Sequence, residues 1–184
     1  MSEEDDVRSL VSRAVDSDPD AWEEIYRRSH GRLFSYARRR TFSVHSAEDA
    51  VSETIVRAME QIDRFSWSGA GFDAWLFGIM RNVVFEGYRA DAKARRDRYF
   101  VPDGSERLDP LEMVVALNDA DRVRRAFAQL SASEQEVLEL RVVAELTSDG
   151  AAEVLGKTPG AVRMAQARAL ERLRQFMTEV DRGD

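Results

Sequence analysis

The most constraining feature of the sequence is a helix stop followed at once by a helix start near Gly156. Gly156 suits the left-handed residue that commonly ends a helix. Thr158 and Pro159 suit the cap and the first turn of a new helix. The short segment before the stop, which we expect Ser148 to cap, predicts one helix of the pair. With a further helix before it, residues 131–177 indicate a helix-turn-helix unit.

The last predicted helix has two unlike faces. At about 100° per residue, apolar side chains gather on one side and short or basic side chains on the other. The apolar face holds Val162, Ala165, Ala169, Leu170, Leu173 and Phe176, and the other face holds Gly160, Arg163, Met164, Ala167, Arg168 and Glu171. Residues 155–176 contain five basic side chains and one acidic side chain, a net charge of +4. This pattern favours a helix in a DNA major groove, although an ordinary helical hairpin can share it.

Composition predicts an all-α protein. Proline and glycine are scarce, at 4 and 10 residues, and no run of alternating β-branched residues is present. The chain has no cysteine, which excludes disulfides and cysteine-based zinc sites. The acidic N-terminus does not resemble a signal peptide, and no apolar run approaches the roughly 18 residues of a membrane span. We therefore expect a cytoplasmic protein without membrane insertion.

Enzymatic chemistry is not indicated. The two histidines, His30 and His45, are not at metal-ligand spacing, and no phosphate-binding loop or hydrolase motif is present. We expect no catalytic residues, no metal and no cofactor.

Helical periodicity divides the chain into two predicted domains. The first spans residues 1–98, a linker rich in proline, glycine and charge spans 99–116, and the second domain spans 117–184. The expected helices outside the helix-turn-helix cover residues 3–16, 20–40, 47–65, 72–98 and 111–130. Asp18 and Ser46 are the expected caps of the second and third helices. Arg38, Arg39 and Arg40 follow the second helix, where favourable interaction with the helix dipole is the simplest explanation.

Two surfaces of the first domain are candidates for binding. The helix after Ser46 carries an outward acidic strip, either a solvated surface or a docking site for a basic partner: Glu48, Asp49, Ser52, Glu53, Val56 and Glu60. The polar loop 66–71 contains Trp67 and precedes a helix with Arg81, Asn82 and Arg89. An aromatic loop beside a basic helix can hold an unstacked base and follow a single strand. Alternatively, Trp67 is packed and the basic residues are solvated.

Three segments taken in order resemble an extracytoplasmic-function (group IV) sigma factor of the sigma-70 family. They are AEDAVSETIVRAMEQIDRF, FDAWLFGIMRNVVFEGYRADAKARR and LSASEQEVLELRVVAELTSDGAAEVLGKTPGAVRMAQARALERLR. The resemblance implies a region 2 helical bundle over residues 1–98 and a region 4 helix-turn-helix over 117–184, joined by a flexible linker. It also implies that the chain binds core RNA polymerase and directs promoter-specific initiation.

The resemblance also implies residue roles. Asp49, Ser52 and Glu53 correspond to the face that binds the clamp helices of the polymerase β′ subunit. Residues implied in recognition and melting of the −10 element are Trp67, Trp75, Arg81, Asn82 and Arg89. Residues implied at the −35 element are Thr158, Arg163, Met164, Ala167 and Arg168. The apolar side of region 4 is expected to bind the β flap, and an anti-sigma factor is an expected partner.

Four positions of the helix-turn-helix depart from the family pattern, among them Ala165 and Ala167, which stand where basic or bulky residues are often found. Gly150 and Ala151 stand where larger, more acidic residues are usual, and glycine inside a helix costs about 1 kcal/mol relative to alanine. Two other functions stay open on the sequence alone: a stand-alone helix-turn-helix regulator, which binds duplex DNA without polymerase, and a helical adaptor, which binds no DNA.

Overall fold

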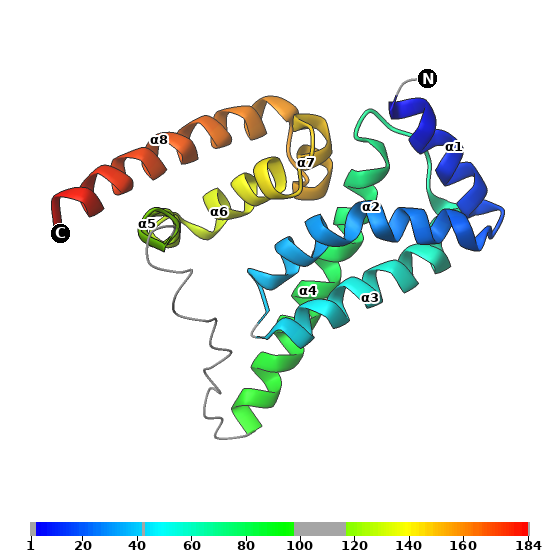
Figure 1. Cartoon of the computed structure of the whole chain (residues 1–184), viewed down its shortest axis with the longest axis horizontal. Helices are drawn as coiled ribbons and strands as arrows, with labels where there is room; N and C mark the ends of the chain where they lie inside the picture. The colour runs from blue at the N-terminus through cyan, green and yellow to red at the C-terminus, as the bar shows by residue number, and fades with distance from the viewer. Residues whose placement is uncertain (1–2, 42, 98–116, 184) are drawn as a thin grey trace.

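The structure is a computed structural model that describes residues 3–41, 43–97 and 117–183, and every regular element in these ranges is helical (Figure 1). Side chains are described for residues 5–41, 43–87 and 122–178. The predicted linker, residues 99–116, lies outside the described residues, and so does the side chain of Arg89. The all-α prediction is confirmed.

Four α-helices and a short 3₁₀ turn build the N-terminal domain. They are α1 (Glu3–Val15), α2 (Pro19–Arg38), α3 (Val44–Gln61), the 3₁₀ turn η1 (Ile62–Arg64) and α4 (Gly71–Asp97). Asp18 caps α2 as predicted, because its carboxylate accepts a hydrogen bond from the Asp20 N–H. The predicted cap of α3 is wrong. Ser43, in an extended conformation, caps the helix by accepting from the Ser46 N–H at 3.0 Å.

The C-terminal domain contains the predicted helix-turn-helix. Its elements are α5 (Leu117–Ala128), α6 (Ala132–Leu138), the π-helical turn η2 (Glu139–Val143), α7 (Ser148–Leu155) and α8 (Pro159–Gly183). Gly156 ends α7 with a φ of 62°, and the Thr158 hydroxyl accepts from the Ala161 N–H at 3.2 Å, as predicted. Thr147, and not Ser148, caps α7 by accepting from the Gly150 N–H.

The larger of two hydrophobic clusters is continuous through both domains. Leu33, Tyr36 and Phe77 of the N-terminal domain belong to the same buried cluster as Leu140 and Val162 of the C-terminal domain. Figure 1 accordingly shows α7 beside the first part of α4. A second, smaller cluster lies wholly within the C-terminal domain, around Leu130, Leu138 and Ala169. The two predicted domains therefore pack against each other.

Helical periodicity predicts that the helix after Ser46 buries one side, and most of that side is buried. The predicted residues are Ala50, Val51, Thr54, Ile55, Ala58, Met59 and Ile62. Ala50, Val51, Thr54 and Ala58 are buried, and Ile55 packs against the core. Met59 is 46% exposed, which contradicts the prediction. With the neighbouring Val56 it adds apolar surface to the outer side of α3.

Tyr36 gives the fold a pH-dependent term. Its hydroxyl is buried and makes no hydrogen bond to any described residue, and burial raises the pKa of Tyr36 from 10.0 to about 12. The folded state holds this proton more tightly than the unfolded state does. The resulting contribution of Tyr36 to the free energy of unfolding is therefore complete below pH 10 and is lost as the pH rises from 10 to 12. We expect Tyr36→Phe to be at least as stable as wild type at pH 7, since it removes an unpaired hydroxyl.

The measurement is urea unfolding of wild type and Tyr36→Phe between pH 8 and about 11.5, followed by circular dichroism. Wild type should lose about 1.4 kcal/mol per pH unit more than the variant above pH 10. Parallel pH profiles of the two proteins would contradict the assignment of this term to Tyr36.

Candidate nucleic-acid and polymerase interfaces

The first candidate interface is the outer face of α8. Val162 and Ala169 on the inner side are fully buried, whereas Met164 is 63% exposed. The other residues that the resemblance implies at the −35 element are also exposed: Thr158, Arg163, Ala167 and Arg168. The two-faced character predicted for this helix is confirmed. A helix with a capped N-terminus, short side chains and two arginines in solvent can enter a major groove.

Polar contacts between helices hold α8 in place. Arg172 of α8 pairs with Glu134 of α6 at 3.0 Å, and the Arg141 Nε of η2 donates to Gln166 at 2.9 Å. Glu134 also completes a capping box with Ser131, and hydrogen bonds from Ser131 hold the pKa of Glu134 below its ordinary value. The helix that carries the exposed face is therefore held by polar contacts from α6 and η2.

The second candidate interface is the acidic strip of α3. Asp49, Ser52 and Glu53 are exposed, as predicted. Glu53 accepts from Arg57 at 2.7 Å, and Arg57 also pairs with Glu86 of α4 at 2.8 Å. These hydrogen bonds, from Glu53 first, raise the pKa of Arg57. The strip thus combines carboxylates with neighbouring exposed apolar side chains, which suits a protein partner better than a nucleic acid.

The third candidate interface is the loop between η1 and α4. Trp67 packs edge-on against Phe65 at 5.1 Å, and the guanidinium of Arg8 lies 4.4 Å from its ring centre. Trp67 is nevertheless 37% exposed. Trp75 is half-buried between Phe65 and Phe72, with ring centres 5.2 and 5.4 Å away. The loop is therefore a partly packed aromatic cluster that leaves one indole at the surface.

The sequence suggests that Arg81, Asn82 and Arg89 of α4 share one surface with loop 66–71. The described side chains support this only in part. Asn82 is exposed. Arg81 lies over the Phe85 ring and pairs with Glu136 of α6 at 2.8 Å. Arg81 is therefore directed toward the C-terminal domain, and the side chain of Arg89 lies outside the described residues.

Several residues at the boundary between the domains were not identified from the sequence. Arg40 lies against the Tyr36 ring at 3.8 Å and forms an ion pair with Glu139 of η2. Arg39 lies over the ring of Phe127 in α5. Only Arg38 of the arginine triplet lies in the last turn of α2, where the dipole explanation applies. The sequence signal for these contacts was the run of three consecutive arginines, because a favourable interaction with the helix dipole does not require three.

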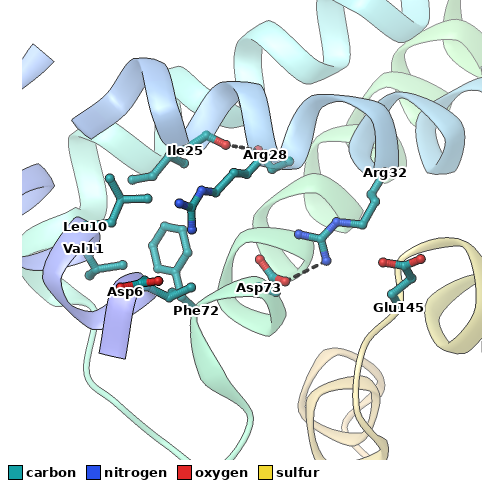
Figure 2. A pocket seen from close by; sticks show the side chains of 11 residues that line it. Asp6, Leu10, Val11, Ile25, Arg28, Arg32, Phe72, Asp73 and Glu145 are labelled. Carbon is teal, nitrogen blue, oxygen red and sulfur yellow. Dashed lines mark hydrogen bonds and ion pairs between the residues drawn. The ribbon is translucent and has the colours of Figure 1, made fainter. Parts of the chain in front are cut away.

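A cavity of about 520 Å³ marks this boundary near the start of α4 (Figure 2). Arg32 of α2 donates to Asp73 of α4 at 2.7 Å and to the Ala144 carbonyl at 3.2 Å. Glu145, with a left-handed φ of 57°, lines the same cavity from the C-terminal domain. A second hollow, of about 850 Å³, lies between loop 67–71, α1 and residues 145–147. Both hollows are therefore formed jointly by the two domains.

The described residues contain no group of three or more acidic or histidine side chains that could hold a metal ion. Among the same residues, no helix is both long enough and apolar enough to cross a membrane.

Comparisons with known proteins agree with this arrangement. The family model of sigma-70 region 2 matches residues 25–94, and that of sigma-70 region 4 matches residues 126–175. The fold and these matches define the class: a sigma-70-type initiation factor built from regions 2 and 4.

Relatives narrow the class further. The chain is 32% identical to the ECF RNA polymerase sigma factor ShbA of Streptomyces griseus, over 91% of this chain and 93% of ShbA. It is also 32% identical to the ECF RNA polymerase sigma factor SigD of Mycobacterium tuberculosis, over 90% of this chain and 81% of SigD. The chain belongs to the extracytoplasmic-function RNA polymerase sigma factors. It acts in promoter-specific transcription initiation, which neither the stand-alone regulator nor the adaptor hypothesis accounts for.

Solved structures share the fold. CnrH, solved in complex with the cytosolic domain of CnrY, has a TM-score of 0.68 at 24% identity, covering 94% of this chain and 97% of CnrH. RpoE of Bartonella quintana, solved with the anti-sigma factor NepR, has a TM-score of 0.64 at 24% identity, covering 85% of this chain and 96% of RpoE.

Proposed function

We propose that the three candidate interfaces divide the work of initiation among them. The acidic strip of α3 binds the β′ clamp helices of core polymerase, loop 66–71 and α4 bind the −10 element, and α8 reads the −35 element. The observation that carries the proposal is the exposed face of α8, where Arg163 and Arg168 lie in solvent while Val162 and Ala169 on the opposite side are fully buried. Because these two arginines do not pack in the core, their side chains are available to contact DNA.

At the −35 element, α8 offers two kinds of contact. Arg163 and Arg168 can donate to guanine edges or phosphates, and Met164 offers an apolar contact. Ala167 allows close approach of the helix to the groove, and Thr158 fixes the helix start. The apolar side of region 4 binds the β flap.

At the −10 element, the exposed Trp67 gives an unstacked base a ring on which to stack. Unstacking a base costs a few kcal/mol, so a protein surface that accepts the base favours the melted state. Trp75 supports the loop through the aromatic cluster, while Arg81, Asn82 and Arg89 follow the strand. The chain itself carries out no bond chemistry and needs no cofactor.

An anti-sigma factor is proposed as a further partner. Two of the solved relatives in fold were captured in complexes, RpoE with an anti-sigma factor and CnrH with the cytosolic domain of CnrY. The site of action is the cytoplasm, where polymerase and promoter DNA are found.

The decisive test is co-elution of the purified chain with bacterial core RNA polymerase on a sizing column, followed by run-off transcription. A stoichiometric complex that starts transcription at defined promoters is the expected result. A folded chain that does not co-elute with core would overturn the proposal.

Asp49→Ala combined with Glu53→Ala should weaken core binding by roughly tenfold, because two charged contacts at a protein interface are lost. Both side chains are exposed, so folding should not change. Binding is measured by fluorescence anisotropy of labelled chain titrated with core polymerase. The matched control, Glu23→Ala with Asp63→Ala, removes two exposed carboxylates from α2 and η1. Equal affinities of the two double variants would exclude the α3 strip.

Arg81→Ala combined with Asn82→Ala should slow promoter opening by about tenfold while core binding is retained, because contacts to the separated strand are removed. Opening is followed by permanganate reactivity of thymines near the −10 element in the assembled holoenzyme. Glu86→Gln on the same helix serves as the control, since its carboxylate pairs with Arg57 and is not among the residues assigned to the −10 element. Normal opening by the double variant would remove α4 from the proposed site.

A further inference from the structure

The first helix, α1, is fixed against the N-terminal domain, although it precedes residues 25–94, the segment that the region 2 family model matches. Leu10, Val11 and Ala14 of α1 are buried and belong to the larger hydrophobic cluster. Near the end of α1, the Ala14 carbonyl accepts a hydrogen bond from the buried indole N–H of Trp22 in α2 at 3.2 Å. A side chain on the outer part of α1 is therefore held in a defined place relative to the rest of the domain.

Arg8 is the residue of α1 that reaches the loop proposed to bind the −10 element. Its guanidinium lies over the Trp67 ring, 4.4 Å from the ring centre, which is within the range of a cation–π contact. Both side chains are exposed, and both line the hollow of about 850 Å³ beside loop 67–71. The indole that is proposed to receive an unstacked base therefore has a positive charge from another helix beside it.

A guanidinium that lies over an aromatic ring keeps its hydrogen-bond donors. The group is planar and its N–H donors lie in its plane, so a ring against its face leaves the donors at its edge available. A base that stacks on Trp67 brings the phosphates on either side of it close to the same ring. Phosphate oxygens are acceptors that match the donors of a guanidinium in charge and in geometry. Arg8 can therefore contact the indole and a phosphate of the bound nucleotide at the same time.

We propose that Arg8 is a further DNA-binding residue of the −10 site, and that it binds the phosphate next to the base that stacks on Trp67. Trp67 supplies the surface for the base, and Arg8 supplies the charge for the backbone of the same nucleotide. The proposed role rests on the proposed function of loop 66–71, whereas the contact between Arg8 and Trp67 is a feature of the structure itself. Helix α1 thereby becomes part of the DNA-binding surface of the chain.

The test measures how tightly holoenzyme binds a labelled single-stranded oligonucleotide that carries the non-template −10 sequence. Arg8→Ala should weaken binding by about tenfold, as expected for one lost phosphate contact. Arg8→Lys should recover only part of the affinity, because an ammonium group keeps the charge but not the planar set of donors. Arg27→Ala removes an exposed arginine of α2 and serves as the control, which should bind like wild type. Equal binding by Arg8→Ala and wild type would overturn the proposal.

Salt dependence separates a phosphate contact from a role in positioning the indole alone. Each phosphate contact with a single strand contributes about 0.7 to the slope of log affinity against log salt concentration. Arg8→Ala should make this slope shallower by about that amount, whereas Trp67→Ala should weaken binding and leave the slope unchanged. If Arg8→Ala weakened binding without changing the slope, Arg8 would only position the indole and the phosphate contact would be excluded.

Oligonucleotides in which one phosphate at a time is replaced by an uncharged methylphosphonate locate the contact. At one position the replacement should weaken binding to wild type by about tenfold and leave binding to Arg8→Ala unchanged, since the two changes remove the same interaction. If no position behaved in this way, the assigned phosphate contact would be wrong. Failure of the proposed −10 site has a different signature, because Trp67→Ala would then bind every oligonucleotide as wild type does. A defect in Trp67→Ala without one in Arg8→Ala would leave the −10 site in place and remove Arg8 from it.

Discussion

Replacing both Arg163 and Arg168 with alanine should reduce holoenzyme affinity for a promoter with an intact −35 element by roughly a hundredfold. Each arginine that contacts a base edge or a phosphate contributes about 1–3 kcal/mol, so two such contacts contribute about 2–6 kcal/mol, a range that includes the roughly 2.7 kcal/mol of a hundredfold change. Both side chains are exposed on the outer face of α8, so their loss leaves the core of region 4 intact. The salt dependence of binding should also become shallower, because fewer counterions are released.

The measurement is a titration of promoter fragments with holoenzyme at several salt concentrations, with matching and scrambled −35 sequences. Arg27→Ala with Arg38→Ala removes the same net charge from two exposed positions of α2, away from the recognition face of α8, and serves as the control. If both double variants bind alike, the effect is one of bulk charge and α8 does not read the promoter.

Arg40→Ala should have the largest effect on stability, because it leaves Glu139 buried without its ion-pair partner. Removing one member of a buried pair typically costs about 3–5 kcal/mol. Burial already raises the pKa of Glu139, which shows how poorly this site tolerates an unpaired carboxylate. The cost has an upper bound, since separation of the domains would return Glu139 to water. The loss of unfolding free energy therefore cannot exceed the free energy that docking contributes.

Urea unfolding of Arg40→Ala beside Arg38→Ala measures this cost. Arg38 is exposed on the last turn of α2, so its replacement should change stability by less than about 0.5 kcal/mol. The double variant Arg40→Met, Glu139→Met should recover most of the loss, because two apolar side chains suit a buried site. If Arg40→Ala and Arg38→Ala were equally stable, the ion pair would contribute nothing to docking.

Local signals in the sequence predicted the helices well. Gly156 and Thr158 placed the turn of the helix-turn-helix, and the periodicity of α8 separated its buried face from its exposed face. The errors were small shifts of one to three residues at the caps of α3 and α7, where several serines and threonines stand close together. Any of these hydroxyls can cap a helix, so backbone conformation decides which one does.

The contact between the domains could not be predicted in this way. Arg81 and Glu136 are 55 residues apart, and Ser68 and Glu153 are 85 apart, so no periodic pattern relates them. The sequence did mark Gly150 as unfavourable within a helix, and the structure supplies a physical reason, because a side chain there would meet Ala70 and Ala74. Candidate site residues were recognisable by type and position. The pairing of Arg81 with Glu136 was not predictable in this way.

The domains that meet at this boundary are joined covalently by the 19 residues between Asp97 and Leu117. A tether of this length keeps two partners at an effective concentration on the order of millimolar. Contacts too weak to hold separate chains together at cellular concentrations can therefore keep the two regions docked. Proteolytic cleavage of the tether would turn docking into a bimolecular equilibrium, and the two regions would separate on dilution.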